Sequence, residues 1–226
     1  MTKNKFTALL PIKANSQRVP GKNFKFLGAK PLFEWILSSL ISSNYIEEII
    51  INTDSIPSFE DSKLVLNKKV TLKERPIEIC GDFVSMNKVI EHDILNSEKE
   101  NFLMTHTTNP FISTKTLNSA FQEYLNALKS ENFDSLFSVN KIQSRFYYEN
   151  AKPVNHNPEE LLRTQDLEPW FEENSCLYIF SKMTFLKNNS RIGLKPLMHR
   201  TPPLESIDID NKDDWNLASA LAEAKY

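Results

Sequence analysis

Three basic side chains lie close together in one polar loop near the start of the chain. Lys13, Arg18 and Lys22 fall within Pro11–Asn23, which overlaps and follows the apolar stretch Phe6–Ile12. Cationic side chains and exposed backbone N–H groups bind phosphate oxygens, and open α/β sheets bind ligands beyond the carboxyl ends of their strands. The loop is therefore a candidate phosphate site, with a merely solvated basic loop as the alternative.

Two carboxylates stand two positions apart near the end of the chain. In an extended segment Asp208 and Asp210 point to one side, while Ile207 and Ile209 pack on the other. Magnesium prefers oxygen ligands, is usually held by one or two carboxylates, and completes its shell with water and phosphates. The pair is therefore a candidate Mg²⁺ site.

Helix capping offers a second explanation for the same acidic segment. Asp210 or Asn211 is a candidate N-cap of the helix that follows, with Asp213 and Asp214 favouring its N-terminus. The two explanations are compatible, because capping leaves Asp208 without a role.

Composition excludes several other kinds of site. The chain has 226 residues, with 27 basic and 29 acidic side chains and only 4 glycines. Gly21, Gly28, Gly81 and Gly193 cannot form either a dinucleotide-binding G-x-G-x-x-G motif or a P-loop. A net charge of -2 disfavours a broad nucleic-acid-binding face, so we expect a small-molecule partner.

The cysteines and the N-terminal apolar stretch bear on location. Cys80 and Cys176 belong to no C-x-x-C pair, which argues against a disulfide framework or a zinc site. The stretch Phe6–Ile12 is too short for a signal-peptide core or a membrane span. We expect a cytoplasmic protein that contacts no membrane.

Short apolar runs alternate with helical patterns along the chain. Strands are predicted at 6–12, 46–51, 102–105, 135–139, 176–180 and 194–199. Helices are predicted at 32–40, 84–95, 114–128 and 213–225, the last with Trp215, Leu217, Ala218 and Leu221 facing inward. This alternation predicts one α/β domain, with helices on both faces of a mostly parallel sheet. The irregular, aromatic-rich segment 142–173 is predicted to leave the sheet as a lid or a dimerisation arm.

The two candidate sites stand in a longer series of motifs that resembles the sialic-acid-activating cytidylyltransferases, the acylneuraminate and related keto-sugar-acid enzymes. That family has a first strand followed by P-A-R-x-x-S-K-R-L-P-G-K-N and then a helix beginning G-K-P-L. Matching residues here are Ser16, Arg18, Pro20, Gly21, Lys22, Asn23, Lys30, Pro31 and Leu32. Further matches follow in order at Asn52–Asp54, Arg75–Ser85, Thr108–Pro110, Asp134–Ser135, Arg163–Leu167, Asn174–Phe180 and Glu205–Asp210.

The resemblance implies a Rossmann-like nucleotidyltransferase fold over residues 1–226 and a transfer of CMP. CTP would be the donor, the anomeric hydroxyl of a nonulosonic-type 2-keto sugar acid the acceptor, and a CMP-sugar and pyrophosphate the products. Arg18, Lys22 and Asp210 would be catalytic, and Asp208 with Asp210 would hold Mg²⁺. A homodimer that uses the middle segment is also implied.

The resemblance further implies residues for each substrate. The nucleotide would contact Lys13, Ala14, Asn15, Ser16, Asn23, Arg75, Val84 and Ser85. The acceptor would contact His106, Thr108, Gln165 and Tyr178.

Four positions depart from the family pattern. Lys13 replaces an arginine, His106 a glutamine, Thr164 an arginine and Ser175 a glycine. These changes lie on the acceptor or phosphate side, which leaves open transfer to another sugar or sugar phosphate. A non-catalytic CTP-binding member of the family is a third possibility, which the retained carboxylate pair disfavours.

Overall fold

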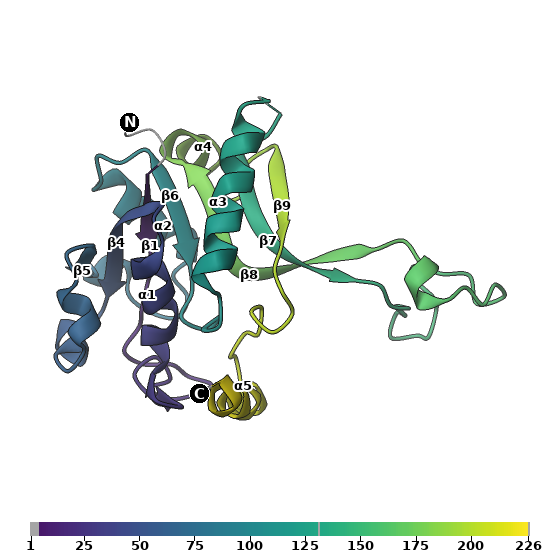
Figure 1. Cartoon of the computed structure of the whole chain (residues 1–226), viewed down its shortest axis with the longest axis horizontal. Helices are drawn as coiled ribbons and strands as arrows, with labels where there is room; N and C mark the ends of the chain where they lie inside the picture. The colour runs from purple at the N-terminus through teal and green to yellow at the C-terminus, as the bar shows by residue number, and fades with distance from the viewer. Residues whose placement is uncertain (1–4, 131, 226) are drawn as a thin grey trace.

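The computed structural model describes residues 5–130 and 132–225 and has a seven-stranded central sheet (Figure 1). The strands are β1 (Phe6–Leu9), β4 (Ile46–Thr53), β5 (Val70–Glu74), β6 (Asn101–Thr105), β7 (Ser135–Ile142), β8 (Trp170–Ser181) and β9 (Pro196–Arg200). They lie in the order β5-β4-β1-β6-β8-β7-β9, with β8 antiparallel to both neighbours and all other pairs parallel. The predicted mostly parallel α/β fold is confirmed.

Helices cover both faces because alternate strand residues point to opposite sides. On one face Ala8 and Ile49 pack with α1 (Leu32–Ser42) and α3 (Thr114–Leu128). On the other, Leu9 and Ile50 pack with α2 (Met86–Leu95) and α4 (Lys182–Asn188). The apolar strands therefore read as continuous runs, as expected of a sheet buried on both faces.

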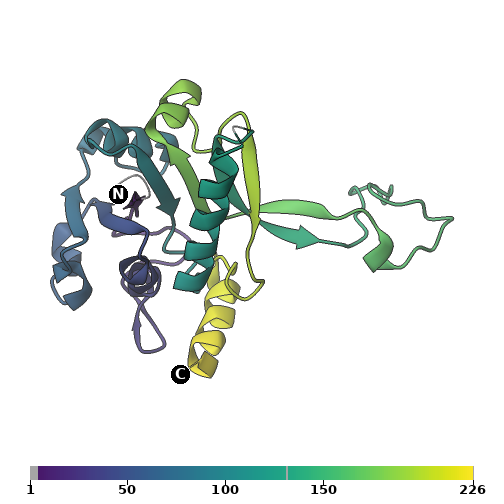
Figure 2. The same ribbon diagram turned by 45° about the horizontal axis from the view of Figure 1, so that its top comes forward.

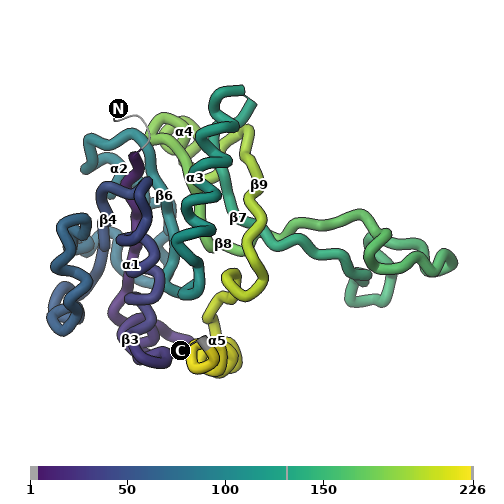
Figure 3. Tube along the Cα trace, viewed as in Figure 1, coloured from purple at the N-terminus to yellow at the C-terminus, as the bar shows by residue number. Residues whose placement is uncertain are grey.

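A third apolar cluster lies at one end of the sheet and includes α5 (Lys212–Lys225). Trp215, Ala218 and Ala222 face this cluster at helical spacing, beside the short hairpin of β2 (Phe26–Leu27) and β3 (Lys30–Pro31). Figure 3 shows α5 next to that hairpin. The predicted inward orientation of Leu217 is wrong, since it is 55% exposed and lies off the buried stripe.

The middle segment leaves the body as a projecting arm (Figures 1 and 2). Strands β7 and β8 continue pairing as far as Ile142 and Trp170, and the chain between them folds back on itself. The arm contains the 3₁₀ turn Thr164–Asp166 and a single bridge between Tyr147 and Pro153.

The body of the protein contains three further 3₁₀ turns, at Ile56–Phe59, Lys63–Leu66 and Ile77–Ile79. No helix within residues 5–130 and 132–225 combines the length and apolar character needed to cross a bilayer.

Candidate active site

The basic loop emerges from β1 at the carboxyl end of the parallel strands. The Ile12 N–H donates to the Asn52 carbonyl, which extends the strand before the loop begins. Gly21 then adopts a left-handed φ of 64°, and its carbonyl accepts from the Phe24 N–H at 3.1 Å. Val19 is buried in the cluster beneath α5. A turn and an apolar anchor thus fix the loop at the edge where α/β sheets bind ligands.

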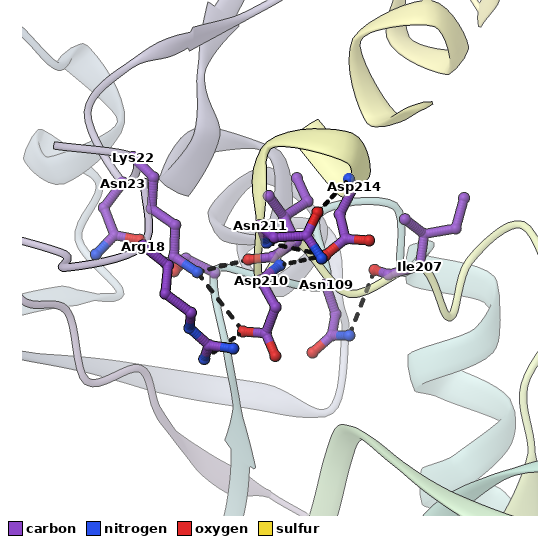
Figure 4. Close-up of polar contacts among 10 residues, drawn as sticks. Arg18, Lys22, Asn23, Asn109, Ile207, Asp210, Asn211 and Asp214 are labelled. Carbon is purple, nitrogen blue, oxygen red and sulfur yellow. Dashed lines mark hydrogen bonds and ion pairs between the residues drawn. The ribbon is translucent and has the colours of Figure 1, made fainter. Parts of the chain in front are cut away.

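Two cations of the loop converge on Asp210 (Figure 4). An Arg18 guanidinium nitrogen lies 2.8 Å from Asp210 Oδ1, and Lys22 Nζ lies 4.0 Å from the same oxygen. Lys22 is buried and donates to the Ile209 carbonyl at 2.5 Å. Burial lowers its pKa, and the nearby Asp210 and Asp208 carboxylates oppose that shift. The two motifs, far apart in sequence, therefore form one charged cluster.

The start of α5 resolves the capping question. Asn211 Oδ1 accepts from the N–H groups of Asp213 and Asp214, at 2.8 and 3.0 Å. Asp214 Oδ2 accepts in return from the N–H groups of Asp210 and Asn211, both at 2.9 Å. This reciprocal arrangement is a capping box that does not use the Asp210 carboxylate. The capping explanation is confirmed for Asn211, and the Asp210 carboxylate is left to face the cations. The Mg²⁺ site stays a prediction.

The carboxylate pair fits a cation that is shared with phosphates. Burial raises the pKa of Asp208, while a hydrogen bond with the Thr108 side chain opposes the shift. Asn109 contacts the same segment through its amide nitrogen, 3.4 Å from the Ile207 carbonyl, and its buried Oδ1 has no hydrogen-bond partner among the described residues. No cluster of three His, Cys, Asp or Glu able to hold a metal occurs in the described residues. The oxygen-only donors therefore suit Mg²⁺ completed by water and phosphate, which needs one or two carboxylates.

The remaining loop residues are tied to neighbouring segments. Lys13 Nζ donates to the Gly81 carbonyl at 2.8 Å and pairs with Asp82 at 3.2 Å. The Ala14 N–H donates to Asp54 at 2.7 Å. Asn15 is exposed and Ser16 is half-buried in the same loop.

Asn23 is buried, and its side-chain amide links the basic loop to the segment after β6. Its Nδ2 donates to the Lys13 carbonyl at 2.7 Å, and its Oδ1 accepts from the Thr107 hydroxyl at 2.6 Å. Both ends of the amide are thus used within the protein. The contact of Asn23 with a nucleotide stays a prediction, whereas its two hydrogen bonds within the protein are observed.

Arg75 and the start of α2 form the other wall of the predicted nucleotide site. The buried Arg75 donates through Nε to Asn52 Oδ1 at 2.6 Å and through Nη2 to the Asn52 carbonyl at 2.9 Å. Ser85 Oγ caps α2 by accepting from the Asn87 N–H at 3.2 Å, and Val84 beside it is half-buried. Arg75 is therefore committed to the interior, while the segment before α2 borders the edge.

The predicted acceptor residues gather where β6 and β8 meet the edge. His106 follows β6, and burial together with the charges of Arg191 and Lys22 lowers its pKa to about 4. Tyr178 is fully buried, and its hydroxyl donates to Glu173 and lies 3.2 Å from Ser175 Oγ. Burial raises the pKa of Tyr178 to about 12. This corner therefore presents a neutral imidazole and a protonated phenol at neutral pH.

Ser175 shows why glycine is common in the family at its position. It has a left-handed φ of 56°, where the register between β7 and β8 shifts. A side chain in that conformation costs on the order of 1 kcal/mol. The bulge turns Tyr178 and Glu173 toward one another.

Gln165 is the predicted site residue that the structure does not bring to the others. It lies in the arm, where its carbonyl accepts from Gln143 Nε2 at 3.1 Å. The arm extends away from the basic loop (Figure 1). Gln165 is therefore not part of the cluster that the other predicted site residues form.

The sequence motifs did not single out Arg191, Glu173 or Asn109 as site residues. Glu173 directly precedes a recognised motif, and Asn109 stands inside the Thr108–Pro110 match. Arg191 belongs to no motif, so only its proximity to Tyr178 and His106 identifies it.

Comparisons with known proteins show what the chain as a whole is similar to. N-acylneuraminate cytidylyltransferase A of Danio rerio is 26% identical over 220 residues, which are 94% of this chain and 49% of that protein. CMP-N,N'-diacetyllegionaminic acid synthase of Legionella pneumophila is 26% identical over 237 residues, which cover 96% of this chain and 95% of that protein. A solved CMP:2-keto-3-deoxy-manno-octonic acid synthetase complexed with CTP has a TM-score of 0.66 at 11% identity, covering 98% of this chain and 100% of that one.

These matches differ in extent. The chain spans about half the length of the N-acylneuraminate enzyme and nearly the whole length of the Legionella enzyme. The family described as cytidylyltransferase matches residues 7–225. The chain therefore belongs to the cytidylyltransferase family.

Proposed function

We propose that this protein transfers CMP from CTP to the anomeric hydroxyl of a nonulosonic-type 2-keto sugar acid. The observation that carries the proposal is the convergence of Arg18 and Lys22 on Asp210 at the carboxyl edge of the sheet. Relatives named for sialic acid and legionaminic acid activation support the acceptor class. A cytoplasmic location is part of the proposal.

The chemistry follows from positioning and charge neutralisation. The acceptor hydroxyl oxygen attacks the α-phosphorus, the bond from that phosphorus to the α,β-bridging oxygen breaks, and pyrophosphate leaves with the electron pair. The hydroxyl proton passes to a base or to water. Arg18 and Lys22 would neutralise phosphate oxygens, a role that suits an in-line displacement in which charge develops on those oxygens. The brace through Asn23 keeps the loop in place while the substrates bind.

Mg²⁺ is the metal proposed for this site, held by Asp208 and Asp210. When bound, it polarises phosphate oxygens and lowers the cost of charge that develops on them. Asp210, which pairs with Arg18 here, would be one of the two residues that hold the metal, and the Arg18 guanidinium would then bind phosphate oxygens.

A homodimer formed through the arm completes the proposal. The arm exposes Tyr147, Tyr148, Leu161 and Leu162, an unusual set for a surface that meets only water. A second chain that packs against the arm would cover these side chains. The Gln165 of one chain would then lie at the acceptor pocket of the other chain. Light scattering in solution tests the mass, with a monomer counting against this part of the proposal.

Activity is tested by incubating the chain with CTP, MgCl₂ and a panel of nonulosonic and octulosonic acids. Pyrophosphate release should require both substrates and stop when EDTA removes the metal. Calorimetric titration with CTP, UTP, GTP and ATP should show preference for CTP. Tight CTP binding without pyrophosphate release for any acid would favour the non-catalytic reading, and release with a neutral sugar or sugar phosphate would redirect the acceptor.

A further inference from the structure

A hollow of about 320 Å³ lies beside the predicted acceptor residues. Its walls come from three elements: Ser85 and Asn87 at the start of α2, Glu173 on β8, and Ser190 and Arg191 after α4. Most of these side chains are polar. The hollow is therefore suited to a polar group of a small molecule.

The Arg191 side chain lines this hollow and contacts an aromatic ring, but its guanidinium makes no hydrogen bond within the described residues. Its guanidinium carbon lies 4.1 Å from the centre of the Tyr178 ring, and the side chain is only 22% exposed. The nearest carboxylate oxygen, on Glu173, is 3.9 Å from Nη2, which is too long for a hydrogen bond. Within residues 5–130 and 132–225 its guanidinium donates no hydrogen bond. The N–H donors of a guanidinium that lies over an aromatic ring are thus available to an acceptor in the hollow.

The other cations at this edge are already engaged. Lys13 is held by Gly81 and Asp82, and Arg75 donates twice to Asn52. Arg18 and Lys22 converge on Asp210, at the place proposed for phosphates. Arg191 is therefore the cation of this set whose hydrogen-bonding capacity is unused and whose position is separate from the triphosphate cluster.

The backbone around Arg191 is fixed on both sides. Asn189 ends α4 in a left-handed conformation with φ 48°, and its carbonyl accepts from Asn87 Nδ2 at 3.0 Å. Downstream, Gly193 passes so close to the Asp134 carboxylate that an added Cβ would lie 2.2 Å from its oxygen. The Leu194 N–H also donates to Asp134 at 2.9 Å. The segment that carries Arg191 is thus tied to α2 on one side and to Asp134 on the other.

His106 links this hollow to the phosphate cluster. Arg191 and Lys22 are both close enough for their charges to lower its pKa. The positive charges of both side chains therefore disfavour protonation of the imidazole, which stays neutral near pH 7. A 2-keto sugar acid carries its anomeric hydroxyl and its carboxylate on the same carbon, so an acid that reacts near Lys22 would place its carboxylate near His106, which the charge of Arg191 also reaches.

We propose that Arg191 binds the carboxylate of the acceptor sugar acid, through paired N–H···O bonds, and so makes the enzyme select an acid over a neutral sugar. The inference rests on the proposed function, since it concerns the acceptor of that transfer. The Tyr178 ring lies against the guanidinium, whose planar fork matches the two oxygens of a carboxylate.

The test compares the best acid from the panel with its neutral carboxamide analogue. Wild-type enzyme should have a KM lower for the acid than for the amide. Arg191→Ala should raise the KM for the acid roughly 10- to 100-fold, as expected for lost hydrogen bonds to a charged group, and barely change the KM for the amide. Arg191→Lys should fall between the two, because it keeps charge without the planar fork.

Two measurements separate a lost contact from a damaged fold. Calorimetric affinity for CTP should be unchanged in Arg191→Ala. Arg200→Ala is the matched control, since Arg200 also lies over an aromatic ring, 5.2 Å from Phe171, but outside the hollow. Its acid-to-amide preference should equal that of the wild type.

The outcomes are distinguishable. If wild type turns over an acid but Arg191→Ala retains the full acid preference, Arg191 does not bind the carboxylate, and the proposed function stands. If wild type releases no pyrophosphate with any acid, the proposed function fails and this assignment fails with it.

Discussion

The ligand-binding edge and the arm hold their polar side chains in different ways. At the edge, partners are distant in sequence: Asn23 bonds to Thr107, and Lys22 to the Ile209 carbonyl. In the arm they are near, as in the hydrogen bond of Tyr147 to His156 and the pair of Arg163 with Asp166. Long-range pairing ties several elements of the edge together, whereas the arm pairs locally and exposes apolar side chains.

This difference implies different responses to mutation. A change at the edge should break contacts between several elements, so it should affect both stability and substrate binding. A change in the arm should leave the body intact and alter association or the partner's site. Four predictions test this contrast.

The largest effect is expected for Asp210→Asn. The variant loses the charge that pairs with Arg18 and that would hold Mg²⁺, so turnover should fall roughly 1,000-fold or more. Mn²⁺ binding in the presence of CTP, followed by electron paramagnetic resonance, should weaken in parallel. Asp213→Ala, at an exposed position in the first turn of α5, is the control. Unchanged turnover in Asp210→Asn would contradict the assigned role.

Asn23→Ala should have the next largest effect. It leaves the Lys13 carbonyl and the Thr107 hydroxyl without their buried partner, which costs about 2 to 3 kcal/mol of unfolding free energy. CTP affinity should fall with it, since the loop loses its brace. Urea denaturation and calorimetry measure the two effects, with the exposed Asn126→Ala as control. Full stability with full CTP affinity would show that the brace is dispensable.

His106 should make the free energy of unfolding depend on pH. Its pKa is about 4 in the folded protein and about 6.5 in an unfolded chain, so only the unfolded state gains this proton as the pH falls from 6.5 to 4. Stability should therefore decrease across that window, by about 1 to 2 kcal/mol after allowance for solvent screening, and this contribution should be constant above and below it.

The slope is measured by denaturation at a series of pH values. His106→Gln should remove this part of it, while His156→Gln in the arm should leave it unchanged. An equal slope in wild type and His106→Gln would show that the imidazole titrates normally.

The smallest effect is expected for Gln165→Ala, at about tenfold in turnover, corresponding to one lost hydrogen bond to substrate. The free energy of unfolding should not change, because the Gln165 contact that holds the arm uses its backbone carbonyl. Co-expression with Asp210→Asn should produce mixed dimers in which one site has both residues. Activity above the mean of the two parent variants would place Gln165 in the partner's site; activity equal to that mean would refute the exchange.

Local residue patterns predicted many of the strands and helices. The apolar runs at Ile46–Thr53 and Asn101–Thr105 and the amphipathic helix Thr114–Leu128 were predictable, because burial on one or both faces imposes a periodicity. The strand Val70–Glu74 and helix Lys182–Asn188 were missed, since both are short and the strand is only half-buried at the sheet edge. The arm's irregular composition was visible, but its direction was not.

The sequence by itself determined which functional groups are present and where they stand: a basic loop after the first strand, and two carboxylates before the last helix. Only the tertiary structure decided how these groups are used. It paired Arg18 with Asp210, engaged both ends of the Asn23 amide, and left the guanidinium of Arg191 without a hydrogen bond inside the described chain. The reason is physical: local periodicity reports which side chains are buried, whereas the partner of each polar group depends on segments brought together only by folding.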